Sequence, residues 1–230
     1  LVKYDVISGC MIKKVYECDE ILKELNERYS NFVEEKETAI SLGVPHWRKE
    51  YLLDNKQTAP IVYQGGVPKE TSIDETEEKI VQLLVNNARM SIVEISQHLE
   101  TTPRVVQYHL KKLREKKVLL ISRFFLNLKK LDWIFVKAIL NFKNLSQERY
   151  AAFITYCDQI KNLTYAINCI GGWDVELDFE IENFNKFNSI LLDIRDKFSD
   201  IIKKYDFVIV LKEEKLDYYP GSKPQYAKRK

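Results

Sequence analysis

The chain has 230 residues, and its 36 Lys and Arg nearly balance its 34 Asp and Glu, leaving a formal net charge of +2. An apolar content of 45% with only 7 Gly and 6 Pro is typical of a folded protein and argues against long disordered linkers. The sequence has no apolar run long enough to span a bilayer and no signal-like start, so we expect a cytoplasmic protein with no membrane partner.

Several kinds of chemical site are not indicated by the sequence. The four cysteines form no CxxC pair and no Cys/His ligand spacing, which predicts reduced core thiols and no metal site. Paired carboxylates, nucleophile–base sets and phosphate-binding glycine loops do not occur in the pattern either. We therefore expect no catalytic residues and no cofactor.

Residues 1–45 have the pattern strand, helix, strand, and they are similar to a later part of the same chain. Laid without gaps at an offset of 169, residues 4–42 match residues 173–211 in their apolar pattern and at eight identical positions. The identities are Asp5, Val6, Ile12, Ile21, Leu22, Ser30, Ile40 and Leu42. The repeat predicts a βαβ half of a larger sandwich. Because such a half leaves a strand edge uncovered, it must pair with residues 133–211 of this or another chain, or fray.

Residues 46–72 are expected to form an ordered linker to the next domain. The segment holds an amphipathic stub at 48–51 and a short strand at 61–63, with glycine and proline as punctuation. At the other end of the chain, residues 213–230 read as a polar, flexible tail.

Residues 73–131 contain three helical segments separated by short breaks, which is the spacing of a tri-helical DNA reader. The predicted helices are Glu77–Asn86, Ile92–Leu99 and Pro103–Arg114. Each has a start signal: Asp74 for the first, Ser91 with Glu94 as a capping box for the second, and Thr102 before a proline for the third. Strand-like stretches at 119–122 and 124–128 then predict a wing.

The third helix carries the positive charge of the chain. Residues 102–130 hold nine Lys or Arg and one acid, which indicates a local anion-binding surface on a nearly neutral protein. In a major groove, Arg104 can pair with guanine and Gln107 with adenine, while lysines further along are placed for phosphates. The predicted DNA-binding residues are Thr102, Arg104, Gln107, Tyr108, His109, Lys111, Lys112, Arg114 and Arg123. A basic, solvated helix in an ordinary three-helix bundle is the alternative.

Residues 132–212 alternate between strand and helix patterns in the order β-α-β-β-α-β, which is a ferredoxin-like sandwich. The predicted elements are strands at 133–142, 163–170, 173–181 and 201–211, with helices at 146–160 and 184–198. In the third strand Val175, Leu177, Phe179 and Ile181 alternate with acids, so we expect the acids on a solvent-facing side. The fold class is α+β: a winged helix-turn-helix followed by this sandwich and preceded by the half-sandwich.

Two stretches resemble the leucine-responsive/asparagine-regulator (Lrp/AsnC) family of transcription regulators. They are Asn87–Leu119, which opens Asn-Ala-Arg-Met-Ser-Ile, and Gly171–Phe179, which reads GGWDVELDF. The resemblance covers residues 73–212 and implies a DNA reader with a RAM-type sandwich that forms homo-dimers or higher oligomers. One departure is that Lys116-Lys117-Val118 stands where the family usually has glycine before the wing. The third helix therefore needs another way to reverse the chain.

The resemblance also implies a site for a small effector, often an amino acid. Effectors of the family bind near a Gly-x-x-Asp turn, which nominates Gly171, Gly172, Trp173 and Asp174. The residues themselves leave a second reading open, because two glycines suit any tight turn and the tryptophan can pack at an interface. Together with the repeat, the resemblance predicts an archaeal-type protein with two reader–sandwich units in tandem, truncated here at its N-terminus.

The prediction is a sequence-specific regulator that binds double-stranded DNA, and two other functions stay open. The sirohaem decarboxylases share the architecture, but they need His and Arg gathered in a sandwich cavity. Here His46, His98 and His109 all lie outside residues 132–212, which argues against that enzyme. A sensor or oligomerisation module that does not bind DNA is the other alternative, and the basic third helix argues against it.

Overall fold

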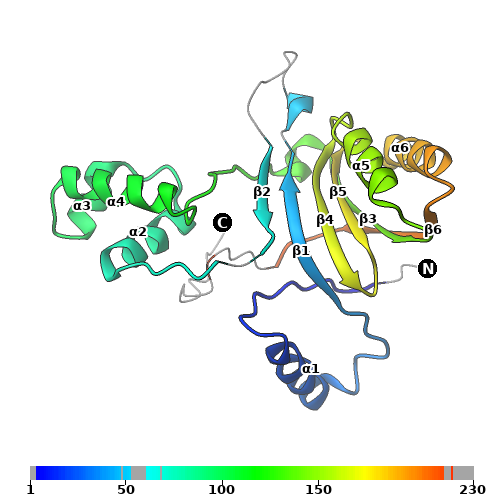
Figure 1. The fold of residues 1–230 in the computed structure, drawn as a ribbon, viewed down its shortest axis with the longest axis horizontal. Coiled ribbons are helices and arrows are strands. Elements are labelled where there is room, and N and C mark those ends of the chain that lie inside the picture. Colours follow the sequence, from blue (N-terminus) through cyan, green and yellow to red (C-terminus); the bar gives the residue numbers. More distant parts are fainter. Residues whose placement is uncertain (1–3, 48, 53–60, 68, 215–218, 220–230) are drawn as a thin grey trace. The chain divides into compact units, whose positions relative to one another are not determined.

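The computed structural model describes residues 4–47, 49–52, 61–67, 69–214 and 219, and Figure 1 shows its ribbon. The helices are α1 (Tyr16–Tyr29), η1 (Glu50–Leu52), α2 (Glu75–Asn86), α3 (Ile92–His98), α4 (Pro103–Glu115), η2 (Leu128–Leu131), α5 (Gln147–Cys157) and α6 (Phe184–Lys197). The strands are β1 (Ala39–His46), β2 (Val62–Gly65), β3 (Ile134–Phe142), β4 (Leu163–Gly171), β5 (Val175–Ile181) and β6 (Ile202–Val210). The chain divides into two compact units, Leu1–Tyr63 with Leu128–Leu211, and Gln64–Asn127 with Lys212–Lys230.

The first unit, here called the sheet unit, contains the predicted ferredoxin-like sandwich. Its strands lie in the order β2-β1-β4-β5-β3-β6, so the four C-terminal strands have the order expected of a β-α-β-β-α-β fold. Helices α5 and α6 pack on one face of this sheet (Figure 1), and a buried core joins Phe153 of α5 and Phe187 of α6 to Phe179 of β5. The predicted order and type of all six elements are confirmed, with ends that differ by up to three residues.

The N-terminal part of the chain extends this sheet with β1. The strand pairs antiparallel with β4, for example Ile40 with Ile170 and Ala39 with Gly171. The expectation that this segment must find a partner strand within residues 133–211 is thus confirmed within one chain. The expected strand at the start of the half-sandwich is wrong, because residues 4–12 form no strand. A strand needs a neighbour for its backbone N–H and C=O groups. Within the described part of residues 1–45, β1 is the segment that pairs with another strand.

Helix α1 forms where the repeat predicts it, since the counterpart of α6 at an offset of 169 is residues 15–28. Its surroundings differ from those of α6. Phe187, Leu191 and Ile194 of α6 are buried, whereas no residue of α1 is buried. Two helices with the same apolar pattern therefore have different amounts of packing.

The acidic side of β5 differs from the prediction. Every residue of this strand is buried, including Glu176, Asp178 and Glu180, so the acids do not lie on an open solvent face. Lys137 of the neighbouring strand β3 forms ion pairs with Glu176 and Asp178, and Lys49 forms one with Glu180. The alternation itself is correct, but a period of two cannot reveal whether the polar face is covered.

The second unit, here called the helix-turn-helix unit, has the three predicted helices. Asp74 and Ser91 each form a capping box, and the Thr102 side chain accepts a hydrogen bond from the Val105 amide. These start signals are confirmed, and the helices begin and end within two residues of the predicted limits. Ile80, Ile95, Val106, Leu110 and Leu113 form the buried core of the unit.

Helices α3 and α4 both reverse without glycine. Beyond α4, Lys117 has φ 57°, its amide donates to Arg114 O, and the Val118 amide donates to Leu113 O. This is a Schellman motif with lysine in the left-handed position, which answers how the helix ends without the expected glycine. Glu100, with φ 50°, has the same role after α3. The predicted wing strands are wrong, because residues 119–127 form no strand.

Among the described residues, no helix is both long and apolar enough to cross a membrane. Most of the predicted tail, 215–218 and 220–230, lies outside the described residues, as does Arg48 of the predicted linker stub. Residues 53–60 and 68 of the linker lie outside the described residues as well. Its described part contributes η1 and β2, and β2 pairs at the edge of the sheet.

Candidate nucleic-acid interface

Helix α4 has one buried face and one exposed face. Val106, Leu110 and Leu113 recur at spacings of four and three residues, which places them on one side of a helix, and all three are buried. Arg104, Gln107, Tyr108, Lys111 and Arg114 are exposed. The buried side fixes the orientation of the helix, so the exposed side presents cations, an amide and a phenol to solvent.

The exposed side chains suit a role in binding DNA. Tyr108 is 61% exposed, and the Lys111 side chain is 78% exposed with only a 3.8 Å contact to Glu115 one turn on. Arg104 lies in the first turn of the helix, directly after Pro103. In a helix that enters a major groove, side chains of the N-terminal half reach base edges.

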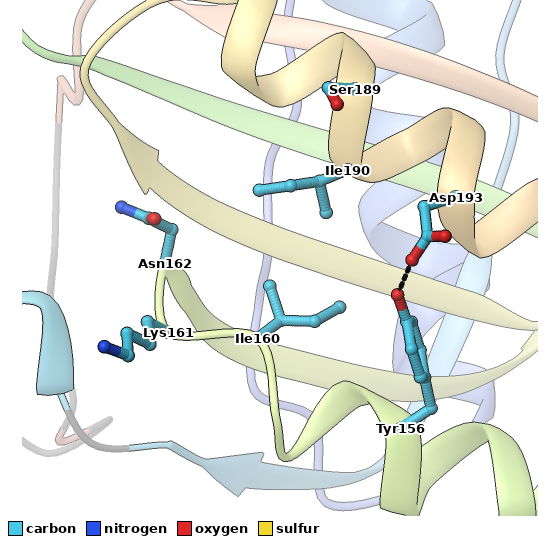
Figure 2. A pocket seen from close by; sticks show the side chains of 7 residues that line it. All are labelled: Tyr156, Ile160, Lys161, Asn162, Ser189, Ile190 and Asp193. Atoms are coloured by element: carbon cyan, nitrogen blue, oxygen red, sulfur yellow. Dashed lines mark hydrogen bonds between the residues drawn. The ribbon is translucent and has the colours of Figure 1, made fainter. Parts of the chain in front are cut away.

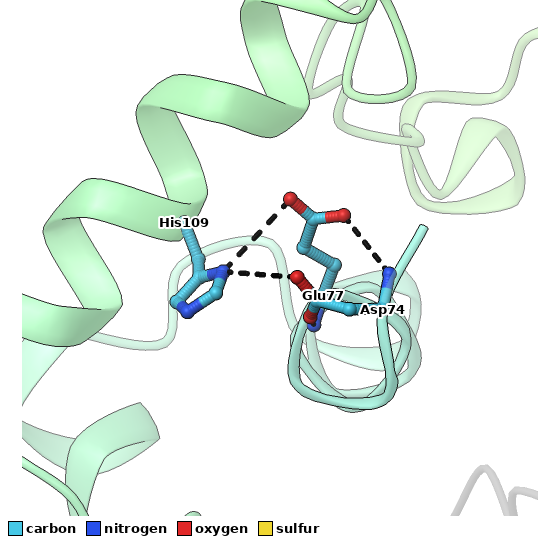
Figure 3. Close-up of side chains that lie close together, drawn as sticks. All are labelled: Asp74, Glu77 and His109. Atoms are coloured by element: carbon cyan, nitrogen blue, oxygen red, sulfur yellow. Dashed lines mark hydrogen bonds and ion pairs between the residues drawn. The ribbon is translucent and has the colours of Figure 1, made fainter. Parts of the chain in front are cut away.

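His109 and Lys112, two other predicted DNA-binding residues, are directed toward the start of α2. Lys112 Nζ lies 3.2 Å from Glu77 Oε1 and 3.5 Å from Asp74 Oδ2, and His109 Nδ1 lies 3.8–3.9 Å from the same two oxygens. Figure 3 shows the carboxylates of Asp74 and Glu77 facing the imidazole ring. The structure thus separates these two residues from the exposed group on α4.

Glu77 is the centre of this cluster and is fully buried. Burial acts to raise its pKa, but hydrogen bonds from Lys116 and the Asp74 amide, together with nearby Lys112, lower the pKa to about 2. Lys116 Nζ lies 2.7 Å from Glu77 Oε2, so the carboxylate is held from both sides. The close approach of the Glu77 carboxylate raises the pKa of Lys112 in turn.

Thr102 and Arg123, the two remaining predicted DNA-binding residues, lie outside the exposed face of α4. The hydroxyl of Thr102 is used as the cap of α4, with its oxygen 3.4 Å from the Val105 amide. Arg123 is half-buried in the stretch after α4, where the wing was expected. Sequence reasoning did not identify Asp74 and Glu77 as partners of α4, because their capping pattern explains them locally.

The predicted effector turn is closely packed by its own chain. Gly171 has φ 121°, and a Cβ there would lie 2.6 Å from the Thr38 carbonyl oxygen, so both the turn and the neighbouring segment require glycine. The Gly172 amide donates to the same oxygen at 2.9 Å. Asp174 Oδ2 accepts the Phe142 amide at 2.6 Å. These bonds occupy the Gly172 amide and one carboxylate oxygen of Asp174.

Trp173 lies against the N-terminal segment, with its ring centroid 6.3 Å from that of Tyr4 in an edge-to-face arrangement. Elsewhere in the sheet unit, a hollow of about 420 Å³ lies between the end of α5 and α6 (Figure 2). Its lining residues are Tyr156, Ile160, Lys161, Asn162, Ser189, Ile190 and Asp193. The four predicted effector residues do not line this hollow.

His46 is part of the sheet. His46 ends β1 and packs edge-to-face on Tyr165 of β4, with ring centroids 5.0 Å apart. All three histidines lie outside residues 132–212, as the sequence-based argument states, but His46 joins the same sheet through β1. The residue is buried against an aromatic ring, which gives it a packing role.

Residues 73–119 match the family of winged helix-turn-helix DNA-binding domains. A transcriptional regulator from Neisseria meningitidis, solved in complex with L-Met, is 21% identical with a TM-score of 0.55 over 64% of this chain and 95% of that chain. Escherichia coli AsnC is 16% identical with a TM-score of 0.55 over 65% of this chain and 99% of that one. An AsnC family transcriptional regulator from Agrobacterium tumefaciens is 13% identical with a TM-score of 0.56, covering 64% of this chain and 95% of that chain.

Among curated proteins, no sequence matches this chain significantly. The solved structures, at these identities, are evidence of a shared fold. They cover 64–65% of this chain and nearly the whole of their own chains. Residues 73–119 are thus similar to winged helix-turn-helix DNA-binding domains, and the chain shares its fold with solved AsnC-type regulators.

Proposed function

We propose that this protein is a sequence-specific DNA-binding transcriptional regulator of the Lrp/AsnC type, with α4 as its recognition helix. The observation that carries the proposal is the exposed face of α4. Arg104, Gln107 and Tyr108 are exposed in its first half, while Lys111 and Arg114 follow in its second half. The winged helix-turn-helix match at residues 73–119 supports the same role.

The roles on this face divide by position. Arg104 and Gln107 have the geometry for bidentate pairing with guanine and adenine, so we assign base recognition to them and to neighbouring Tyr108. Lys111 and Arg114 are assigned to phosphates, which position the protein without reading sequence. Thr102, His109, Lys112 and Arg123 keep a secondary role, since Thr102 caps the helix and two of the others face α2.

The sheet unit is proposed to form homo-dimers or higher oligomers and to respond to an amino-acid effector. The regulator from Neisseria meningitidis was solved in complex with L-Met, which supports an amino acid as the class of effector. We place that effector at Gly171, Gly172, Trp173 and Asp174. An effector at this turn must then compete with contacts that the chain already makes there, such as the Thr38 carbonyl beside Gly171 and the Phe142 amide bonded to Asp174.

The experiment is selection of bound sites from random duplex DNA, with and without a pool of amino acids. We expect an enriched motif, and we expect Arg104→Ala to lose discrimination at one base pair, by about 1–3 kcal/mol. Lys143→Ala, which removes an exposed cation from the loop after β3, is the matched control and should select the same motif. Failure to enrich any motif, or an unchanged motif with Arg104→Ala, would contradict the assignment. A motif that is identical with and without amino acids would argue against the effector alone.

A further inference from the structure

Asp74 and Glu77, at the start of α2, each use one carboxylate oxygen in the capping box, and the second oxygen of each points toward α4. Asp74 Oδ1 accepts the Glu77 amide at 2.8 Å, and Glu77 Oε2 accepts the Asp74 amide at 3.1 Å. The second oxygens, Asp74 Oδ2 and Glu77 Oε1, face Nδ1 of His109 on α4 (Figure 3). The three atoms lie within 4.8 Å of one another.

Two atoms of this group are buried without a hydrogen bond. Glu77 Oε1 and His109 Nδ1 both lack a hydrogen-bond partner among the described residues, and they lie 3.9 Å apart. The Glu77 side chain is fully buried, so the charge on this oxygen is balanced by the Lys112 ammonium group rather than by water. Both atoms point to the same place, which is the geometry of a site for a shared cation.

A cation already lies near that place. The ammonium group of Lys112 approaches Glu77 Oε1 at 3.2 Å and Asp74 Oδ2 at 3.5 Å. Its side chain is 38% exposed, so it can leave toward solvent, whereas Lys116 bonds the other oxygen of Glu77 and can stay. A divalent ion has twice the charge of the ammonium group that it would replace.

We propose that Asp74, Glu77 and His109 form a binding site for a divalent transition-metal ion such as Zn²⁺, and that the ion displaces Lys112. Imidazole nitrogen and carboxylate oxygen are both ligands that such ions take, and water can complete the shell. At metal–ligand distances of about 2.1 Å, tetrahedral ligand atoms lie about 3.4 Å apart, so the two distances from His109 Nδ1, 3.8 and 3.9 Å, must shorten by about half an ångström. The two carboxylate oxygens lie within 4.8 Å of each other and must also move closer together. Asp74, at 46% side-chain exposure, leaves the site open to solvent.

The capping box is the outer shell of this site. It fixes both carboxylates through backbone amides, so the ligand oxygens are oriented before an ion arrives. The site joins α2 to α4, and its occupation would release Lys112 beside Lys111. This consequence rests on the proposed function, because only then does a released lysine add a phosphate contact.

The first test measures Zn²⁺ binding to the full chain by calorimetric titration after removal of metal with a chelator. We expect one ion per chain, with affinity at least about 10-fold lower for His109→Gln and for Asp74→Ser. Serine retains the helix cap, so Asp74→Ser removes a ligand with little effect on folding. His98→Gln, which changes an exposed histidine of α3, is the matched control and should bind as the wild type does.

The result that would overturn the site is no saturable binding at one ion per chain, or binding that both variants leave unchanged. Thermal unfolding in chelator keeps folding separate from metal binding, because the variants should then unfold like the wild type. If His109→Gln is unfolded in chelator, Asp74→Ser alone decides the result.

The second test separates the metal site from DNA binding. With DNA, Zn²⁺ should steepen the log–log salt dependence of affinity by about one unit in the wild type and not in Lys112→Gln. An unchanged slope in the wild type would overturn the release of Lys112. A chain that binds Zn²⁺ but no DNA would instead overturn the proposed function, so the two failures are distinguishable.

Discussion

The two units each bury an acidic cluster, and the clusters differ in how many cations they hold. In the helix-turn-helix unit, Glu77 has two lysines, Lys112 and Lys116, and its pKa is lowered to about 2. In the sheet unit, Asp178 and Glu176 share the single cation of Lys137. Burial raises the pKa of Asp178 to about 7 despite that lysine.

The opposite pKa shifts of Glu77 and Asp178 follow from the position of each acid in its secondary-structure element. Glu77 lies at a helix start, where the capping box and the positive end of the helix favour a carboxylate. Asp178 lies in the middle of a strand and has no such local support. A buried carboxylate that faces two cations keeps its charge over a wide pH range, while two carboxylates that share one cation leave one carboxyl group sensitive to protons.

The largest effect is expected from removing the shared cation. Lys137→Met would leave Glu176 and Asp178 buried with no cation between them, so we expect a loss of about 3–5 kcal/mol in the free energy of unfolding. Chemical denaturation followed by a signal from the sheet unit measures it. The control Lys143→Met, at an exposed position, should change stability by less than about 0.5 kcal/mol. A loss below about 1 kcal/mol for Lys137→Met would show that water reaches the two acids.

The two clusters should also respond differently to pH. Because the pKa of Asp178 is raised above its ordinary value, the folded sheet unit holds a proton that the unfolded chain has lost. Its free energy of unfolding should therefore fall as pH rises from about 4 to about 7. Glu77, whose pKa is lowered, stabilises its unit throughout that range and loses this contribution only as pH falls below about 4.5 toward 2.

Denaturant titrations followed residue by residue by NMR, at several pH values, measure this contrast. Signals of β5 should show the decline with rising pH, and signals of α4 should not. Asp178→Asn should remove the decline in β5. The same decline in both units, or a decline that Asp178→Asn leaves intact, would contradict the assignment to Asp178.

A smaller loss in the free energy of unfolding is expected at Glu77, the acid that faces two lysines. Glu77→Gln keeps the capping box, since an amide can reach back to the Asp74 amide, but it removes the charge that faces the two lysines. Both lysines can turn to solvent, so we expect a loss of about 1–3 kcal/mol by chemical denaturation. Glu75→Gln, at an exposed position on the same helix, is the control and should cost less than about 0.5 kcal/mol. Equal effects of the two variants would mean that burial at Glu77 has no energetic consequence.

The smallest effect is a gain in stability at the end of α4. Lys117 has a left-handed backbone, which costs a non-glycine residue about 1 kcal/mol, so Lys117→Gly should raise the free energy of unfolding by about that amount. Lys117→Ala has the same backbone strain and should give no gain. If alanine and glycine stabilise equally, loss of the charge and not relief of strain is responsible.

The sequence predicts the elements whose signals are local. Asp74, Ser91 and Thr102 mark three helix starts, and the alternation of Val175, Leu177 and their neighbours marks β5. All of these depend on residues within a few positions of one another. The exposed face of α4 is predicted for the same reason, because the positions of Val106 and Leu110 fix the opposite side.

Features that depend on distant partners were missed or wrong. The burial of Asp178 depends on Lys137 in another strand, and the loss of the first N-terminal strand depends on which neighbour is available. The approach of His109 to Asp74 depends on how α4 packs on α2, which spacing along the chain does not show. The sequence shows that glycine is absent after α4, but it does not show that Lys117 adopts the left-handed backbone conformation that ends the helix.

The most direct test of the central claim, that the exposed face of α4 binds DNA, is the salt dependence of affinity for a selected duplex. The account predicts a linear fall of log affinity with log salt, with a slope that decreases by about one unit for each of Lys111→Ala and Arg114→Ala, and little change for Lys143→Ala. The same slope for the wild type and for the variant that combines Arg104→Ala, Lys111→Ala and Arg114→Ala would contradict it.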